Sequence, residues 1–294
     1  MANSITLIDN WIAVLDEVYQ ASAKSAGLDT GNNLLKWMAQ DKNFKLAKLT
    51  MDGLGDYSRS NGYPVGDVSL TWELHAPDYE RGRMFTVDEM DDEESARLLL
   101  MNLAGEFIRT KVAPELDAVR FASYAALAGT KVSATLAAPA DVLAALRTAQ
   151  TTLDEAEVPS NERYLFITPS LYKPIHDMDT TKSREVLSEF ASVVEVPQAR
   201  FCTAVTLLDG VSTAEKAGGF VKTVAAQDVV AGKNINFEVI HKPAVLQALK
   251  HVKPKFISAD ANQTADAWKY GYRTYGIADV QELKTSGLYL HAKA

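Results

Sequence analysis

The sequence predicts an α+β fold, and three observations support that prediction. The stretch VSLTWELH at residues 68–75 alternates strictly between apolar and polar side chains, which is typical of a strand with one covered face. Residues 91–128 place apolar side chains at helical spacing and predict one long helix. The rest of the chain alternates short helical and strand-like stretches without the regular βαβ repeat of a doubly wound sheet, which favours a mixed architecture.

Residues 44–87 are predicted to form a hairpin that projects from the body. The strand-like stretch FKLAKLTM and the alternating strand are separated by residues 52–67, which are rich in Gly, Ser, Asn and Asp. Limbs of about 17 residues reach about 50 Å, whereas a compact chain of this length has a radius of gyration of about 19 Å. Because an isolated two-stranded ribbon is marginally stable in water, we expect another chain to cover its apolar stripe, which includes Leu70 and Trp72.

The long helix is expected to bend near residues 111–114. Pro114 removes one backbone hydrogen bond and clashes with the preceding turn. Gly129 is placed to follow the last helical residues as the glycine just past the end. The sequence therefore predicts a helix with a kink rather than a straight rod.

Shorter elements follow the long helix. The segment NINFEVIHKPAVLQAL at residues 234–249 predicts a strand that runs into a helix. Further helices are predicted at residues 139–158 and 183–191, and further strands at 163–169, 192–197, 218–224, 253–258, 268–281 and 287–293.

Composition and charge limit the class of protein. With 47% hydrophobic and 23% charged residues in 294, the chain can bury a large core. A compact globule of this mass would expose about 12,000 Å². The net charge of -8 argues against a general nucleic-acid binder. The single cysteine, Cys202, allows no intrachain disulfide and is expected to be buried and inert, and no leader or membrane-spanning run is visible, so we expect a soluble protein.

An acidic cluster in TVDEMDDEES, residues 86–95, puts six carboxylates into seven positions. A glycosidase pair needs two carboxylates facing each other across a cleft, and a calcium loop needs a glycine at its sharp turn. Neither arrangement fits neighbouring acids on one solvated helical turn. Asp91 and Glu94 instead resemble an N-terminal capping box, and the remaining acids favour the positive end of the helix dipole. Arg81 and Arg83 supply two local positive charges, so the excess acid predicts basic groups on another chain.

Motifs of known chemistry are absent from the sequence. It contains no HExxH, paired CxxC, GxSxG or P-loop stretch, and its five histidines do not stand at metal-ligand spacing. We therefore predict no catalytic, metal-binding or cofactor-binding residues and no enzymatic activity.

Two long stretches, in order, resemble the major capsid (coat) proteins of tailed bacteriophages, which have the HK97-like (Johnson) fold. The first is DYERGRMFTVDEMDDEES followed by RTKVAPELDAVRFA. The second is INFEVIHKPAVLQALKHVKPKFIS followed by DANQTADAWKYGYRTYGIADV. The resemblance covers roughly residue 44 to the C-terminus and consists of packing patterns rather than catalytic signatures.

The resemblance implies five parts and a shell that they build. Hexamers and pentamers would tile an icosahedral head around packaged double-stranded DNA, bound without sequence readout, and such a subunit would expose more surface than a compact globule. The parts are an N-terminal arm (1–43), an extended E-loop hairpin (44–87), a peripheral domain with the spine helix (88–130), an axial domain (131–252) and C-terminal strands returning to the peripheral domain (253–294). The inter-subunit contact candidates are Trp11, Leu70, Trp72, Arg81, Arg83, Asp88, Glu89, Asp91, Asp92, Glu93 and Glu94.

Partners and alternatives follow from the same resemblance. Some relatives carry a scaffolding segment ahead of the arm, for which this chain has no room, so we expect a separate scaffolding protein and a portal. No lysine and asparagine are singled out for a covalent crosslink, and none is predicted. We expect assembly in the host bacterial cytoplasm and a final location in the virion. Two alternatives stay open: an encapsulin-like compartment shell, and a soluble carboxylate-dependent hydrolase.

Overall fold

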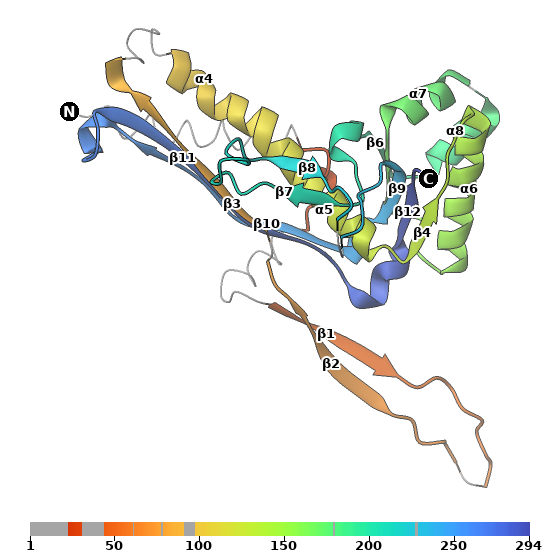
Figure 1. The fold of residues 1–294 in the computed structure, drawn as a ribbon. Coiled ribbons are helices and arrows are strands. Elements are labelled where there is room, and N and C mark those ends of the chain that lie inside the picture. Colours follow the sequence, from red (N-terminus) through yellow and green to blue (C-terminus); the bar gives the residue numbers. More distant parts are fainter. Residues whose placement is uncertain are drawn as a thin grey trace.

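The computed structural model consists of a body from which one hairpin projects (Figure 1). It describes residues 23–30, 44–60, 62–77, 79–90, 98–178, 180–226 and 229–294. The chain exposes 17322 Å², against about 12,000 Å² for a compact globule of its mass. The expectation that the subunit is not compact is confirmed.

Two sheets form the body. A three-stranded antiparallel sheet has the order β10-β11-β3, with β3 at Tyr79–Asp88, β10 at Val245–Ile257 and β11 at Ala267–Val280. A five-stranded mixed sheet has the order β4-β12-β9-β5-β6, with β4 at Thr130–Ser133, β5 at Arg163–Ile167, β6 at Ser192–Glu195, β9 at Ile235–His241 and β12 at Leu288–Ala292.

One long helix connects the two sheets. It comprises α4 (Leu98–Phe107), a π-helical turn η2 (Ile108–Val112) and α5 (Ala113–Leu127). Its first half packs on the three-stranded sheet through Ile108 and Tyr272, and its second half packs on the five-stranded sheet through Phe121 and Phe166. The π-helical turn ends two residues before Pro114, which confirms an irregularity at this point. The expected start at residue 91 lies outside the described residues.

Gly129 follows the helix for a reason of space. A Cβ at this position would lie 2.6 Å from the carbonyl oxygen of Thr285, and the Gly129 N–H donates to that oxygen at 3.0 Å. The glycine therefore lets the segment after the helix approach the backbone before β12.

Three helices cover the other face of the five-stranded sheet: α6 (Pro139–Glu155), α7 (Pro169–Met178) and α8 (Thr181–Ser188). A small hairpin of β7 (Val205–Leu207) and β8 (Phe220–Lys222) reaches back towards β3, as Figure 1 shows. Short 3-10 turns are η1 (Ala26–Leu28), η3 (Gln198–Arg200), η4 (Lys242–Ala244), η5 (Ala259–Ala261) and η6 (Glu282–Gly287).

Sequence-based assignments differ from the structure at three places. The helix expected at the end of residues 234–249 is wrong, because η4 is followed by β10, which pairs with β11 over twelve positions. The expected hairpin 44–87 is divided, since β3 leaves it to pair with β11. The C-terminal strand β12 inserts between β4 and β9 and does not return to the three-stranded sheet. Each difference arises from long-range strand pairing, which local patterns do not encode.

Candidate functional site

The projecting hairpin consists of β1 (Phe44–Met51) and β2 (Val68–His75). Three cross-strand pairs, Met51↔Val68, Leu49↔Leu70 and Ala47↔Trp72, put apolar side chains on one face. That face is open to solvent: Val68, Leu70, Trp72 and Leu74 are 70%, 56%, 60% and 58% exposed. Both strands are confirmed, and the hairpin projects as expected, with no described residue of the same chain covering the apolar face at these four positions (Figure 1).

The tip of the hairpin, residues 52–67, is held by its own bonds. The Asp52 carboxylate accepts from the Asp67 N–H at 2.8 Å, and Ser58 and Gly62 exchange backbone hydrogen bonds of 3.1 and 2.8 Å. The rings of Tyr57 and Tyr63 meet edge to face with centroids 4.9 Å apart. The tip is therefore a shaped loop whose outer side chains are available for contact.

A polar cluster fixes the base of the hairpin to the body. His75 Nδ1 lies 2.7 Å from Asp279 Oδ2 on β11, and His75 Nε2 lies 3.0 Å from Glu73 Oε1. Glu73 Oε1 also accepts from the Glu282 N–H at 2.9 Å, and Lys48 Nζ reaches Glu282 Oε2 at 2.6 Å. These five residues, Lys48, Glu73, His75, Asp279 and Glu282, are called the base cluster below, and together they set the direction in which the hairpin leaves the body.

The electrostatics of the base cluster favour a charged histidine. Burial opposes a charge on His75, but the hydrogen bond to Asp279 and the charges of Asp279 and Glu73 raise the pKa of the imidazole above its ordinary value. Burial likewise opposes the Asp279 carboxylate, yet the bonds from His75 and from the Val280 N–H lower its pKa overall. The two groups therefore stabilise each other as an ion pair.

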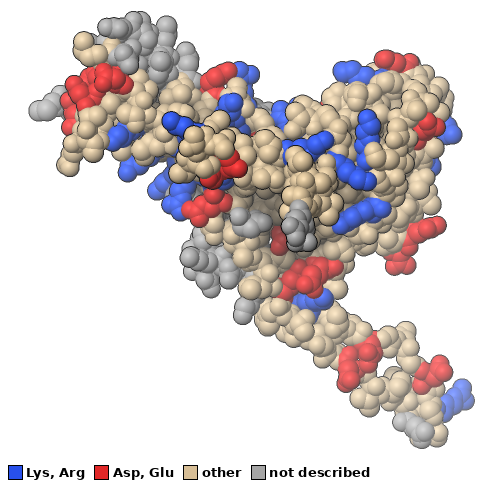
Figure 2. Space-filling model, viewed as in Figure 1, with Lys and Arg blue, Asp and Glu red and all other residues tan. Residues whose placement is uncertain are grey.

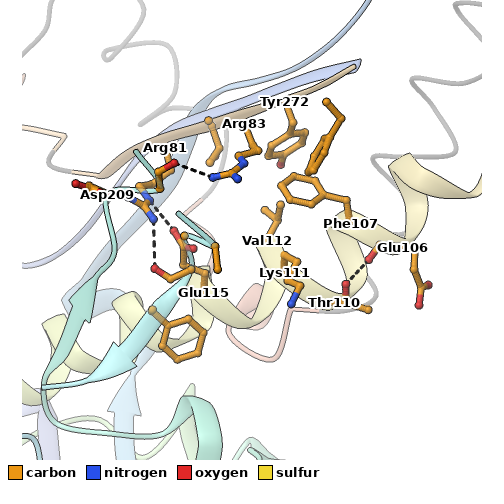
Figure 3. Close-up of a pocket in the computed structure, with 18 of the residues that line it drawn as sticks. Arg81, Arg83, Glu106, Phe107, Thr110, Lys111, Val112, Glu115, Asp209 and Tyr272 are labelled. Carbon is orange, nitrogen blue, oxygen red and sulfur yellow. Dashed lines mark hydrogen bonds and ion pairs between the residues drawn. The ribbon is translucent and has the colours of Figure 1, made fainter. Parts of the chain in front are cut away.

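Arg81 and Arg83 point to the helix side of β3 and bind elements of their own chain (Figure 3). Arg81 Nε donates to Glu115 Oε1 at 2.8 Å, and its Nη2 donates to the carbonyl of Leu208 at 2.7 Å. Arg83 donates to the carbonyls of Gly210 and Lys216 at 3.2 and 2.9 Å. The arginines thus fasten the loop between β7 and β8, and their predicted part in inter-subunit contacts beside the acidic cluster stays a prediction.

The acidic cluster is described only at its beginning. Asp88 is exposed at the end of β3 and accepts from the Met90 N–H at 3.0 Å, while the Glu89 N–H donates to the Asp266 carbonyl at 3.2 Å. Four members of the cluster, Asp91, Asp92, Glu93 and Glu94, and Trp11 of the expected arm lie outside the described residues, so their predicted roles stay predictions.

A cavity of about 730 Å³ lies between α4, η2, β3 and the loop that the arginines hold (Figure 3). Phe85, Phe107 and Tyr272 form an apolar part of its wall, and Glu106 and Lys111 stand at its rim. The Glu115 carboxylate on this wall already accepts from the Tyr79 hydroxyl at 3.2 Å and from Arg81. Glu115 and Arg81 are thus used to pack the loop between β7 and β8 against the helix.

A buried polar network secures residues 23–30 against the long helix. Asp117 is fully buried and accepts from the backbone N–H groups of Lys24 and Ser25 at 2.9 and 3.0 Å, from the Ser25 hydroxyl at 2.7 Å and from Arg200 Nη1 at 3.0 Å. Arg120 Nη1 donates to Ser25 Oγ at 2.9 Å. This network fixes where the chain preceding the hairpin meets the body.

Cys202 and Glu238 are the buried groups most suggestive of chemistry. Burial raises the pKa of the Cys202 thiol, which confirms the expectation of a buried, unreactive cysteine. Burial also raises the pKa of Glu238 well above its ordinary value, and neither of its oxygens has a hydrogen-bond partner among the described residues. In the sequence, Glu238 is a single acid inside the largely apolar stretch INFEVI, and strand periodicity alone does not single it out.

Neither a metal-binding cluster nor a membrane-spanning helix is found among the described residues. Within the described ranges, no three His, Cys, Asp or Glu side chains come together in a way that could hold a metal ion. In the same part of the chain, every helix is too short or too polar to cross a membrane.

Comparison with known proteins gives a consistent fold class. No family model and no curated protein sequence matches the chain. Among solved structures, one from Mycobacterium phage Che8 is similar with a TM-score of 0.60 and 14% identity over 90% of this chain and 89% of that chain. The bacteriophage PhiM1 mature capsid gives a TM-score of 0.62 and 12% identity over 87% and 83%. A virus-like particle from Pyrococcus furiosus gives a TM-score of 0.54 and 11% identity over 94% and 98%.

These likenesses establish the fold. The chain has the mixed α+β HK97-like fold of phage capsid subunits, as its sequence resemblance predicts.

Proposed function

We propose that the chain is a structural major capsid protein without enzymatic activity. It self-assembles as hexamers and pentamers into an icosahedral head that encloses phage DNA. The observation that carries the proposal is the β1–β2 hairpin, whose apolar face is uncovered in a chain with a capsid fold. Fully burying a large apolar side chain is worth about 1.5 to 3 kcal/mol, so a neighbour that covers Leu70 and Trp72 gains a driving force for assembly.

The parts of the chain take the following roles in this proposal. Residues 1–43 are the arm, and its described segment, residues 23–30, is tied to the body by Asp117. The hairpin is the E-loop that lies over a neighbouring subunit. The three-stranded sheet with α4 is the peripheral domain, and the five-stranded sheet with α6, α7 and α8 is the axial domain.

Other partners follow from the same role. A separate scaffolding protein and a portal guide assembly in the host bacterial cytoplasm, and the mature location is the virion. The packaged double-stranded DNA is held without sequence readout, because the chain carries a net charge of -8 and reads no base edges with a dedicated basic motif.

Light scattering and negative-stain imaging of the purified full-length chain test the proposal. Capsomer rings or closed particles of megadalton mass are the expected result. A monomer or small oligomer at every concentration, with or without the scaffolding protein, contradicts it and favours the hydrolase alternative.

A protein compartment of the encapsulin type is the second candidate. The virus-like particle from Pyrococcus furiosus matches nearly all of both chains, which favours this candidate over others outside phage heads. The nucleic acid content of particles purified from their natural source separates the two: packaged genomic DNA supports the phage head, and enclosed protein cargo without DNA supports the compartment.

A further inference from the structure

The outer face of the β10-β11-β3 sheet carries several basic side chains in a chain whose net charge is -8. Side chains that point away from the long helix alternate along each strand with those that face it. Of these outward positions, four are basic, Lys253, Lys255, Lys269 and Arg273, and three are acidic, Glu80, Asp88 and Asp279, the last of which is bound to His75. Figure 2 shows Lys and Arg atoms gathered along this side of the sheet, away from α4.

Two of the basic residues are not paired with an acid in the part of the chain that the structure describes. Lys253 and Arg273 are directly opposite each other on β10 and β11, and like charges in that arrangement repel. Arg273 is paired with Glu80 through its Nε at 3.0 Å, and Lys269 donates to Asn262 at 2.8 Å. Lys253 and Lys255 are exposed and make no ion pair with any described residue.

Two glycines occupy outward positions on this face. Lys255 is opposite Gly271, whereas Lys253 is opposite Arg273, which in turn is opposite Gly82 on β3. A Cβ at Gly82 would lie 3.0 Å from the Tyr272 carbonyl oxygen, so the strand fits closely there only as glycine. Met84 is 55% exposed, and the end of its side chain lies close to the buried Gly271. These residues form a seat with cations on one side and an apolar side chain on the other.

We propose that this seat, defined by Lys253, Lys255, Gly82, Gly271 and Met84, binds the acidic segment Asp88–Glu94 of a second copy of the chain. This inference rests on the proposed shell function and names one of its contacts. The segment carries six carboxylates in seven positions, of which residues 91–94 lie outside the described ranges. We choose this segment as the occupant because its negative charge complements the lysines. The nearby Arg81 and Arg83 bind Glu115 and backbone carbonyls instead of the described acids of this segment.

Asp88 at the end of β3 is too far from Lys253 of the same chain to balance its charge. Asp88 is six residues along β3 from Gly82. Gly82 is opposite Arg273, which is itself opposite Lys253. At about 3.3 Å per residue the separation is about 20 Å, more than twice the screening length at physiological salt. After Met90 the described chain resumes at Leu98 on α4, which packs on the opposite face of the sheet. This geometry favours a second copy as the source of the acids that meet Lys253.

Charge reversal in the full-length chain tests the contact. Lys253→Glu with Lys255→Glu is expected to lower the yield of particles at least about tenfold at low salt, with an unchanged circular dichroism spectrum. Adding Asp91→Lys and Asp92→Lys to the same chain is expected to restore assembly. The matched control, Lys173→Glu with Lys182→Glu, makes the same change in net charge at exposed positions on α7 and α8, away from the three-stranded sheet, and is expected to assemble normally.

Three results overturn the inference while leaving the proposed function standing: normal assembly of the Lys253 and Lys255 variant, equal loss in the control, or normal assembly with reduced DNA content, which assigns the face to nucleic acid. A wild-type chain that forms no particles contradicts the proposed function instead. In that case a labelled peptide of residues 85–97 still decides the inference. Binding to the wild-type chain that weakens at least about tenfold in the Lys253 and Lys255 variant supports it, and absence of binding overturns it.

Discussion

His75 Nδ1 lies 2.7 Å from Asp279 Oδ2, and this contact joins the base of the projecting hairpin to the body across 204 positions of sequence. His75 is the last residue of β2, and Asp279 lies near the end of β11. The hairpin is therefore not a loose appendage, because a partly buried ion pair ties its base to the body. A change in the charge of His75 is expected to weaken that tie.

The first prediction concerns pH. The folded-state pKa of His75 is raised above the ordinary value of 6.5. The pair therefore contributes its full stabilisation below about pH 6.5, and this is lost as pH rises through the higher folded-state pKa. Hydrogen exchange of β2 amides is expected to speed up over that range, beyond the intrinsic effect of pH. His75→Gln is expected to remove this extra pH dependence, and a variant that keeps it contradicts the role assigned to His75.

The second prediction concerns Asp117. Replacing this buried carboxylate with alanine leaves Arg200 and two backbone donors without their acceptor, so the free energy of unfolding is expected to fall by about 3 to 5 kcal/mol. Urea denaturation measures the change. Asp177→Ala, an exposed position in α7, is the control and is expected to change stability by less than about 0.5 kcal/mol. Similar losses at both sites would argue against the network.

The third prediction concerns Glu238. Its folded-state pKa is raised well above the ordinary 4.5 because it is buried among apolar side chains such as Phe166 and Leu290. The contribution of Glu238 to stability is therefore greatest below about pH 4.5 and is lost as pH rises through the folded-state pKa. Glu238→Leu is expected to raise the free energy of unfolding at pH 7 by roughly 1 to 3 kcal/mol, with a smaller gain at pH 4. Equal gains at both pH values would rule out ionisation as the cause.

The fourth prediction concerns Trp72. Its side chain is 60% exposed in the single chain, so Trp72→Ser is expected to change the free energy of unfolding by less than about 0.5 kcal/mol. If a neighbour buries the ring, the same change lowers particle yield about tenfold or more, since the loss of about 1.5 kcal/mol per contact corresponds to that factor. Thr71→Ser, on the opposite face of β2, is the control. Normal assembly of the Trp72 variant would contradict the proposed contact.

Sequence patterns predicted the local elements and missed the long-range pairings. The alternation in β2 and the apolar spacing in α5 identify those elements because each depends on a period within one segment. The helix predicted over VLQAL is wrong, because this stretch fits both periods and only the pairing of β10 with β11 decides between them. The same limit applies to the contact candidates.

Leu70 and Trp72 were selected by alternation, and their exposure in one chain agrees with a role between subunits. Arg81 and Arg83 were selected by their nearness in sequence to the acids, but alternation along β3 turns them to the helix side, away from Asp88. The base cluster could not be found from sequence at all, because Glu73 and His75 meet Asp279 and Glu282 only after the fold forms.

An electron cryo-microscopy map of assembled particles tests the central claim most directly. The account predicts closed shells in which the apolar face of β1 and β2, with Leu70 and Trp72, lies against a neighbouring subunit. Particles in which this face remains open to solvent, or a preparation that contains only monomers under all assembly conditions, would contradict it.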